Sequence, residues 1–160
     1  MVKVSIICIG KLKDAFFEDA SKEYLKRLSA YCQTNIIEIP AASLPQEPSD
    51  ALIQRALSAE AEAIMKKIPD KARVISLCIE GKELSSEGFA EKLESFINAG
   101  AGEICFIIGG SHGLSDEVKA RSDFKLSFSK MTFPHRLARI MLLEQLYRAF
   151  SISTGGKYHK

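Results

Sequence analysis

The stretch that decides the fold is EICFIIGGSHGL, residues 103–114. Its first six residues are almost wholly apolar and predict a buried strand, and the GGSHG that follows predicts a sharp turn at the end of that strand. In open α/β sheets, ligands bind beyond the carboxyl ends of the strands, where glycine lets the backbone approach a ligand closely. A ligand-binding loop and a simple tight turn explain this segment about equally well.

Two familiar phosphate-binding loops do not match the segment. GGSHG lacks the GxGxxG spacing of a dinucleotide-binding turn, and no GK[ST] follows it as in a P-loop. A second strand end carries a similar signal, because Gly81 comes just after the apolar run 74–79. Two such strand ends side by side indicate a cleft, although they do not identify its ligand.

Outward from these two strands, apolar runs and helical patterns alternate along the chain. Strands are predicted at 4–9, 35–39, 74–79, 103–108 and 124–128, and helices at 14–31, 50–67, 86–97 and 134–150. Continuous apolar strands separated by helices predict an α/β fold, with a mostly parallel sheet covered by helices on both faces. The prolines within 41–49 indicate a surface loop. With 160 residues and no linker or repeat, we expect a single domain spanning residues 1–160.

Composition is that of a soluble globular protein, with 46% apolar and 26% charged residues. The opening MVKVSIICIG predicts a buried strand and no export signal, and no stretch approaches the length of a membrane span. The four cysteines show no metal-ligand spacing, so we expect buried, reduced thiols in a cytoplasmic protein without a metal. A net charge of +2 neither favours nor excludes a nucleic-acid partner.

The C-terminal third contains both candidate ligand-binding residues and a long amphipathic helix. Hydroxyl and apolar side chains alternate over 127–133, a composition that suits an adenine ring and a thioether. The wide apolar surface of the helix 134–150 fits either a dimer interface or a central core helix. His135, Arg136, Arg139 and Arg148 give this helix a basic edge, which suits either phosphate contacts or a solvated face. Glu144 and Arg148, four residues apart, are expected to form an ordinary ion pair.

The chain ends in GGKYHK, residues 155–160, which is unusual for a frayed terminus. Tyr158 and His159 offer stacking, hydrogen bonding and a side chain of a type that titrates near neutrality.

Three segments together resemble a known family. IIGGSHGL (107–114), LSFSKMTFPHRLARIMLLEQLYRAF (126–150) and KYH (157–159) are closely similar to the small bacterial SPOUT-superfamily methyltransferases that modify N3 of a pseudouridine in 23S ribosomal RNA. KVSIICIGKLKD (3–14) and EYLKRL (23–28) also match, so the resemblance covers essentially the whole chain.

The resemblance implies a deep trefoil knot at the C-terminal end of the sheet, a homodimer, and S-adenosylmethionine held in the knot loops. Carried over by motif, the cofactor would contact Leu77 after one strand, Gly109 after another, and a third wall formed by Phe128, Ser129, Lys130, Met131, Thr132 and Phe133. Tyr158 and His159 become the candidates to hold the target base or assist loss of its proton, and Arg148 the candidate to anchor base or phosphate. The substrate would be 23S rRNA in the assembled ribosome, and the tail would reach the partner subunit's cofactor.

Three alternatives are weighed against this prediction. A knotted methyltransferase acting on transfer RNA, or on a different base, would have similar cofactor loops. A non-catalytic ribosome-binding factor on the same fold would bind no S-adenosylmethionine. A hydrolase using Ser111 with His112 or His135 is disfavoured, because no acid has a convincing spacing and no GxSxG elbow is present.

Overall fold

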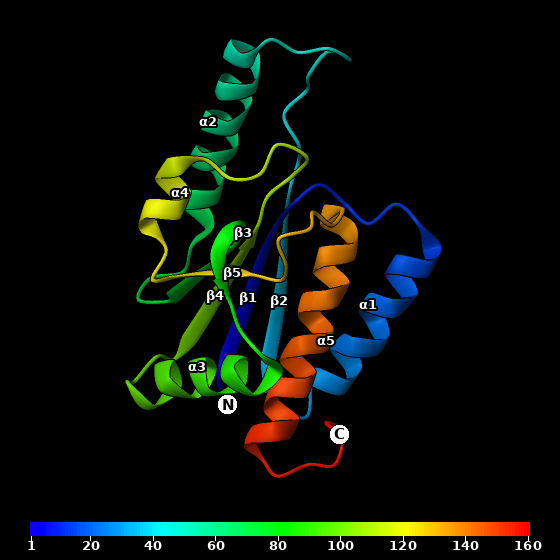
Figure 1. Ribbon diagram of the computed structural model, residues 1–160, viewed down its shortest axis with the longest axis vertical. Helices are drawn as coiled ribbons and strands as arrows, with labels where there is room; N and C mark the ends of the chain where they lie inside the picture. Colours follow the sequence, from blue (N-terminus) through cyan, green and yellow to red (C-terminus); the bar gives the residue numbers. More distant parts are fainter.

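Five parallel strands form one sheet in the computed structural model, which describes residues 1–160. The strand order is β2-β1-β4-β3-β5, with every neighbouring pair parallel. The strands are β1 (Lys3–Ile9), β2 (Gln33–Ile39), β3 (Arg73–Glu83), β4 (Glu103–Ile108) and β5 (Phe124–Ser127). The predicted α/β class with a parallel sheet is therefore confirmed (Figure 1).

Helices cover both faces of this sheet, as predicted. They are α1 (Ala15–Leu28), α2 (Asp50–Lys67), α3 (Ser86–Asn98), α4 (Asp116–Arg121) and α5 (His135–Ser153). Helices α1, α3 and α5 pack on one face of the sheet, to which β1 contributes the side chains of Val4, Ile6 and Cys8. Helices α2 and α4 pack on the other face, against Ile7 and Ile9 of the same strand, because successive side chains of a strand point to opposite faces (Figure 1).

The structure differs from the predicted element boundaries at several points. The short helix α4 was not predicted; the Ser115 side chain caps it by accepting a hydrogen bond from the Val118 amide, and Val118 is fully buried. Strand β3 continues four residues beyond the apolar run, and α5 continues three residues beyond Phe150. Helix α1 ends at Leu28, earlier than the predicted end at residue 31.

The extra length of β3 brings its end against β5. Leu77 and Lys82 both align with Leu126, so residues 78–81 form an irregular excursion between them. A Cβ on Gly81 would lie 2.7 Å from the carbonyl carbon of Leu126, closer than real Cβ contacts allow. Glycine at this position therefore permits the two backbones to approach.

All four cysteines are free thiols. Cys8, Cys32 and Cys105 are buried as expected, whereas Cys78 is only half-buried because it lies where β3 leaves the regular sheet. Burial raises the pKa of Cys8 to about 11 and that of Cys105 to about 12. No helix in the structure combines the length and apolar character needed to span a membrane.

Candidate functional site

Three loops singled out from the sequence lie at one edge of the sheet. Strands β4, β3 and β5 are neighbours, and Leu77 aligns with Ile108 on one side and with Leu126 on the other. Because the strands are parallel, their carboxyl ends meet at the same edge. The structure thus brings together Leu77, the turn beginning at Gly109, and the segment that follows Ser127.

The turn after β4 is built from backbone atoms in close contact. Gly113 has a φ of +77°, a conformation that favours glycine, and its amide donates a 3.1 Å hydrogen bond to the Gly110 carbonyl. Gly109 is buried, and a Cβ there would lie 2.5 Å from the Gly113 carbonyl oxygen and 2.7 Å from its carbon. Only glycine fits at position 109 without moving the turn.

The segment 128–133 is shaped by hydroxyl groups. Ser127 Oγ donates to the Ser129 carbonyl oxygen at 3.0 Å, and Ser129 Oγ accepts a 3.0 Å hydrogen bond from the Met131 amide. Phe128, Ser129 and Phe133 are half-buried, while Lys130, Met131 and Thr132 are exposed. Met131 stands out, with 74% of its surface exposed. The loop therefore offers accessible apolar side chains and hydroxyls at the same edge of the sheet as the Gly109 turn.

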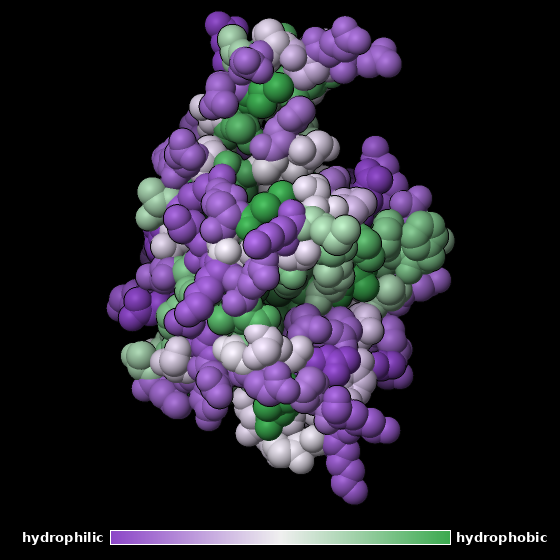
Figure 2. All heavy atoms as spheres, in the orientation of Figure 1, coloured by the Kyte–Doolittle hydropathy of each residue, from purple (hydrophilic) through white to green (hydrophobic).

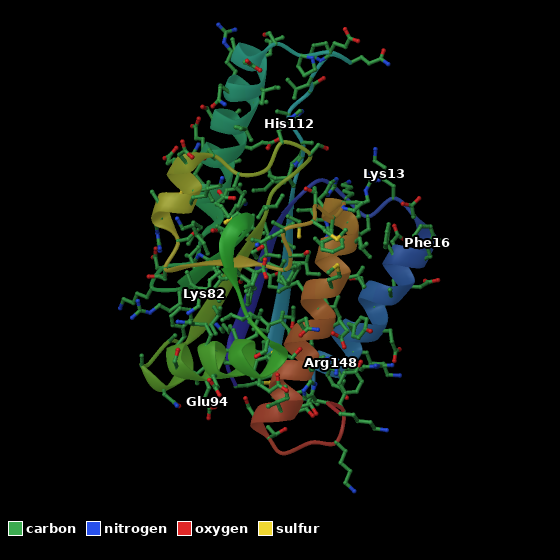
Figure 3. All side chains as sticks on the ribbon, viewed as in Figure 1. Lys13, Phe16, Lys82, Glu94, His112 and Arg148 are labelled. Atoms are coloured by element: carbon green, nitrogen blue, oxygen red, sulfur yellow. The ribbon has the colours of Figure 1, made fainter.

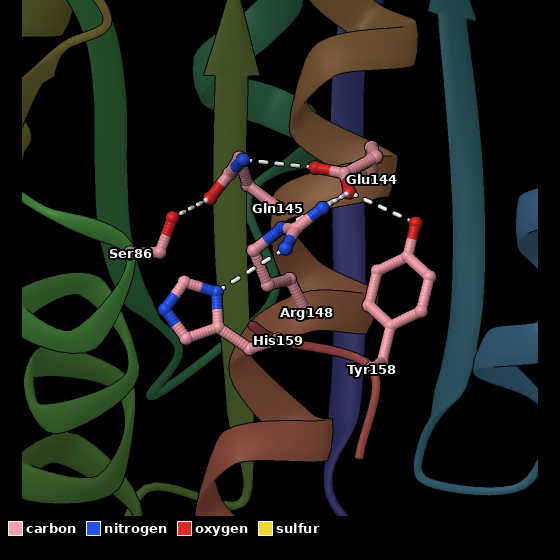
Figure 4. A network of polar contacts seen from close by, with 6 residues as sticks. All are labelled: Ser86, Glu144, Gln145, Arg148, Tyr158 and His159. Atoms are coloured by element: carbon pink, nitrogen blue, oxygen red, sulfur yellow. Dashed lines mark hydrogen bonds and ion pairs between the residues drawn. The ribbon is translucent and has the colours of Figure 1, made fainter. Parts of the chain in front are cut away.

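The three predicted catalytic residues meet in a separate network at the end of α5 (Figure 4). Arg148 pairs with Glu144 at 2.6 Å, and the Tyr158 hydroxyl donates to the same carboxylate at 3.1 Å. The Arg148 guanidinium also lies over the Tyr158 ring, 4.7 Å from its centroid, and 3.2 Å from His159 Nδ1. His159 Nε2 reaches Glu87 Oε1 of α3 at 2.6 Å, which ties the tail to two helices.

This network affects the acidity of its members. Partial burial, followed by the hydrogen bond to Glu144, raises the pKa of Tyr158, so its phenol keeps its proton at neutral pH. The hydrogen bond to Glu144 raises the pKa of Arg148. Tyr158 is thus a hydrogen-bond donor in this arrangement, and Arg148 is a fixed cation.

The tail network and the three loops lie at opposite ends of α5. The first turns of the helix are tied to the carboxyl end of β1, since Arg136 Nε donates to the Lys11 carbonyl and Arg139 Nη2 to the Gly10 carbonyl. A helix of 19 residues spans about 28 Å. Figure 3 shows the separation, with His112 and Lys13 toward one end of the molecule and Arg148 toward the other. Within one chain, the predicted catalytic and cofactor residues do not meet.

One predicted role for the basic edge of α5 is wrong. Arg139 is only 3% exposed, and it is held by Glu38 Oε2 of β2 at 2.9 Å and by the Gly10 carbonyl at 3.0 Å. It fastens the helix to the sheet and is not free to contact a phosphate. Arg136, by contrast, forms no ion pair with a carboxylate.

Comparison with known proteins identifies the family. The model described as predicted SPOUT methyltransferase matches residues 2–159 of this chain. The chain belongs to the SPOUT methyltransferase family.

Relatives of this SPOUT methyltransferase are similar over their entire length. A ribosomal RNA large subunit methyltransferase H from Bacillus cytotoxicus is 50% identical, covering 99% of this chain and 100% of the relative. A protein of the same name from Bacillus thuringiensis is 49% identical over the same extent, and one from Methanococcus maripaludis, named a putative ribosomal RNA large subunit methyltransferase H, is 48% identical. Among solved structures, a probable methylase family protein from Haemophilus influenzae shares the fold, with a TM-score of 0.55 and 18% identity over 98% of this chain and 70% of the other.

Sequence reasoning missed a cleft on this SPOUT chain. It has a volume of about 610 Å³ and is formed by residues 9–13, 38–44, 56–60, 110–112 and 135–136. Ser111, His112 and His135 all line it, yet no hydrogen bond joins Ser111 to either histidine, so the arrangement gives no support to a hydrolase. The five contributing segments are far apart in sequence, and for a functional role the sequence singled out only the Gly110 turn and the basic residues His135 and Arg136, without indicating that they share a cleft.

Proposed function

We propose that this chain transfers a methyl group from S-adenosylmethionine to N3 of a pseudouridine in 23S rRNA of the assembled ribosome, in the cytoplasm. The observation that carries the substrate assignment is the 50% identity, over 99% of the chain, to a relative named for methylation of large-subunit ribosomal RNA. The match of the family model over residues 2–159 supports one methyltransferase domain spanning the chain.

The cofactor fits the three adjacent loops at the carboxyl edge of the sheet. The backbone at Gly109 packs so closely against the Gly113 carbonyl that no Cβ fits, which fixes the shape of this turn, and Leu77 and Phe128 provide half-buried apolar side chains at the same edge of the sheet. An adenosyl group and a thioether need this combination of apolar contact and a few hydrogen-bonding groups, which Ser129 and Thr132 supply. When bound, the sulfonium provides an electrophilic methyl group.

The close approach of β3 and β5 supports the knot. Residues 78–81 leave the sheet and return to the same position of β5, with Gly81 packed against the backbone at 125–126. We propose that this excursion forms part of the loop through which the later chain passes in SPOUT proteins, an exception to the rule that chains avoid knots.

A homodimer accounts for the separation of the two residue groups. Phe16, Met131 and Leu137 are exposed large apolar side chains, with Phe16 near the start of α1 and the other two near the start of α5. Side chains of this kind are expected to be covered in an interface. We propose that a second copy covers them and brings its own Tyr158-His159 tail to the Gly109 loops of the first.

The chain's residues then act by position and hydrogen bonding. Methyl transfer would form the nitrogen–carbon bond, release the donor as S-adenosylhomocysteine and pass the N3 proton to a base, for which His159 is the candidate. Tyr158 and Arg148, which contact Glu144 in this structure, would turn to the target base, where the hydroxyl donates a hydrogen bond and the guanidinium stabilises the negative charge that develops on the ring as the proton departs. Fixing the base in line with the methyl group supplies much of the rate enhancement.

The experiment is methylation of ribosomes with labelled S-adenosylmethionine, followed by mapping of the modified nucleotide. We compare the wild type with Tyr158→Phe and with a chain ending at Lys157, and measure cofactor binding to each by calorimetry. The expected result is that both variants still bind the cofactor, because each keeps its own Gly109 loops, but that both lose most of kcat. Full activity of the truncated chain would refute the role of the tail, and absence of cofactor uptake by the wild type would favour a non-catalytic ribosome-binding factor. Methylation of another RNA in place of 23S rRNA would show that the substrate assignment is wrong.

A further inference from the structure

The cleft of about 610 Å³ lies beside the proposed cofactor site and shares with it only the turn after β4, which contributes Gly110, Ser111 and His112 to the lining. Neither Leu77 nor any residue of 128–133 lines it. Its walls come from the carboxyl ends of β1 and β2, the proline loop after β2, the middle of α2 and the start of α5. Figure 2 shows the surface hollowed beneath the projecting end of α2, and Figure 3 places Lys13 and His112 at this end of the molecule.

The charges at the cleft are unbalanced toward positive. Lys11, Lys13 and Arg136 line it, and none of them forms an ion pair with a carboxylate. The two acidic residues of the lining are already engaged, because Glu38 pairs with the buried Arg139 and Glu60 accepts a 3.1 Å hydrogen bond from the Ala42 amide. Three cations are therefore available for an anionic ligand.

A hydrogen bond to the backbone holds the Arg136 side chain in place at the cleft. Its Nε donates to the Lys11 carbonyl at 3.1 Å, which leaves the two terminal nitrogens of the guanidinium without a partner. A guanidinium held by one nitrogen presents the others as a fork, the geometry that suits a phosphate. The same hydrogen bond holds the Lys11 backbone beside α5.

Between the cations and α2, the cleft has an apolar lining. Ile9 and Ile39 line it as buried residues, and Leu44 and Leu57 line it as half-buried ones. An apolar surface next to unpaired cations is suited to a nucleobase with its phosphate, since bases pack against apolar side chains while phosphates bind cations.

The cleft is also connected to the proposed cofactor loop. Gly110 lines it, and Gly110 directly follows Gly109, the residue proposed to contact the cofactor. A nucleotide in the cleft would thus lie next to the nucleotide that receives the methyl group.

We propose that this cleft binds a nucleotide flanking the methylation target, with its phosphate on Lys11, Lys13 and Arg136 and its base against Leu44 and Leu57. The proposal rests on the proposed function, because it assigns part of the RNA substrate to a defined place. It explains how a chain with a net charge of only +2 binds RNA: three unpaired cations are concentrated at one cleft.

The first test removes two of the cations. The double variant Lys11→Ala/Lys13→Ala is compared with Lys22→Ala/Lys26→Ala, which removes the same charge from exposed positions on α1. Steady-state methylation of ribosomes is measured at several salt concentrations. The expected result is that KM for ribosomes rises about tenfold in the cleft variant. The slope of log KM against log salt concentration should also decrease by about two, which corresponds to two lost phosphate contacts. The matched control changes KM little, and kcat and the Kd for S-adenosylmethionine stay unchanged in both.

The second test fills the apolar part and does not alter charge. Leu57→Trp is expected to raise KM for ribosomes while leaving cofactor binding as in the wild type. Unchanged KM in both cleft variants, or an equal rise in the α1 control, would overturn the proposal.

A direct binding measurement separates this proposal from the proposed function. A short fluorescein-labelled single-stranded oligoribonucleotide is titrated with each variant, and its anisotropy is followed. Weaker binding by the cleft variants supports the proposal even if the wild type methylates no ribosome. If KM for ribosomes rises but oligoribonucleotide binding is unaffected, the cleft contacts a ribosomal protein and the nucleotide assignment is wrong.

Discussion

Replacing Gly109 with alanine adds one methyl group at the most crowded point of the candidate cofactor site. That Cβ would lie 2.5 Å from the Gly113 carbonyl oxygen, 2.7 Å from the Gly113 carbonyl carbon and 3.1 Å from Leu114 Cδ2. Two of these three atoms are backbone atoms of a tight turn, and Leu114 is buried, so no flexible side chain can move aside. The turn itself has to shift.

The size of the effect follows from this geometry. Overpacking of this kind costs about 1 to 3 kcal/mol. In a chain of 160 residues, that cost lowers Tm by about 3 to 10 °C. Because the displaced turn also forms the cofactor wall, we expect the affinity for S-adenosylmethionine to fall by at least about tenfold, which is about 1.4 kcal/mol.

Thermal unfolding and calorimetry with S-adenosylmethionine measure the two effects separately. Gly102→Ala is the matched control, because a Cβ at position 102 meets nothing within 4 Å and the residue has no positive φ. Its Tm and cofactor affinity should remain at the wild-type values. A Gly109→Ala protein with the wild-type Tm would refute the crowding argument. A lowered Tm with unchanged affinity would mean that the turn is structural and does not contact the cofactor.

Three further predictions concern the framework around the site. Arg139→Met leaves Glu38 without its cation and the Gly10 carbonyl without its donor, so urea denaturation should show a loss of about 2 to 3 kcal/mol in the free energy of unfolding. Ellman's reagent at pH 8 should label Cys78 alone in the folded protein, because the other three cysteines are buried, and labelling of two or more thiols would contradict the packing. Burial, followed by the charges of neighbouring arginines, lowers the pKa of His135, so the unfolded chain binds this proton more readily. Stability from this group is complete above the unfolded pKa of about 6.5 and is lost as pH falls below it. Urea midpoints should therefore drop more steeply between pH 7 and pH 5 in the wild type than in His135→Gln.

The strands and the long helices were predictable because their apolar patterns are local. The missed end of β3 reads EGKE, with no apolar run, and it forms a strand only because β5 lies beside it. Helix α4 has six residues, too few for a periodic pattern, and depends on the Ser115 cap and buried Val118.

The candidate site was predictable only in part, for the same reason. Gly109 and the 128–133 segment carry local signals, a glycine turn and a mixture of hydroxyl and apolar residues. The burial of Arg139 has no such signal, because its partners Glu38 and Gly10 are 101 and 129 residues away in sequence. The contact of His159 with Glu87 is equally long-range, and so is the whole basic cleft.

The distance between the tail and the cofactor loops leads to a complementation experiment. If each working site uses the Gly109 loops of one subunit and the Tyr158-His159 tail of the other, a Gly109→Ala chain and a chain ending at Lys157 each have little activity as pure homodimers, provided that S-adenosylmethionine is kept well below the raised Kd of the Gly109→Ala chain. A mixed dimer, however, contains one site made from an intact loop and an intact tail. Random exchange of equal amounts makes about half of the dimers mixed, each with one working site of two, so activity should recover to about one quarter of the wild-type value. The recovery should require subunit exchange and should disappear when one chain carries both changes. If the tail instead served the loops of its own subunit, every chain in the mixture would still lack one half of its site, and mixing would restore no activity.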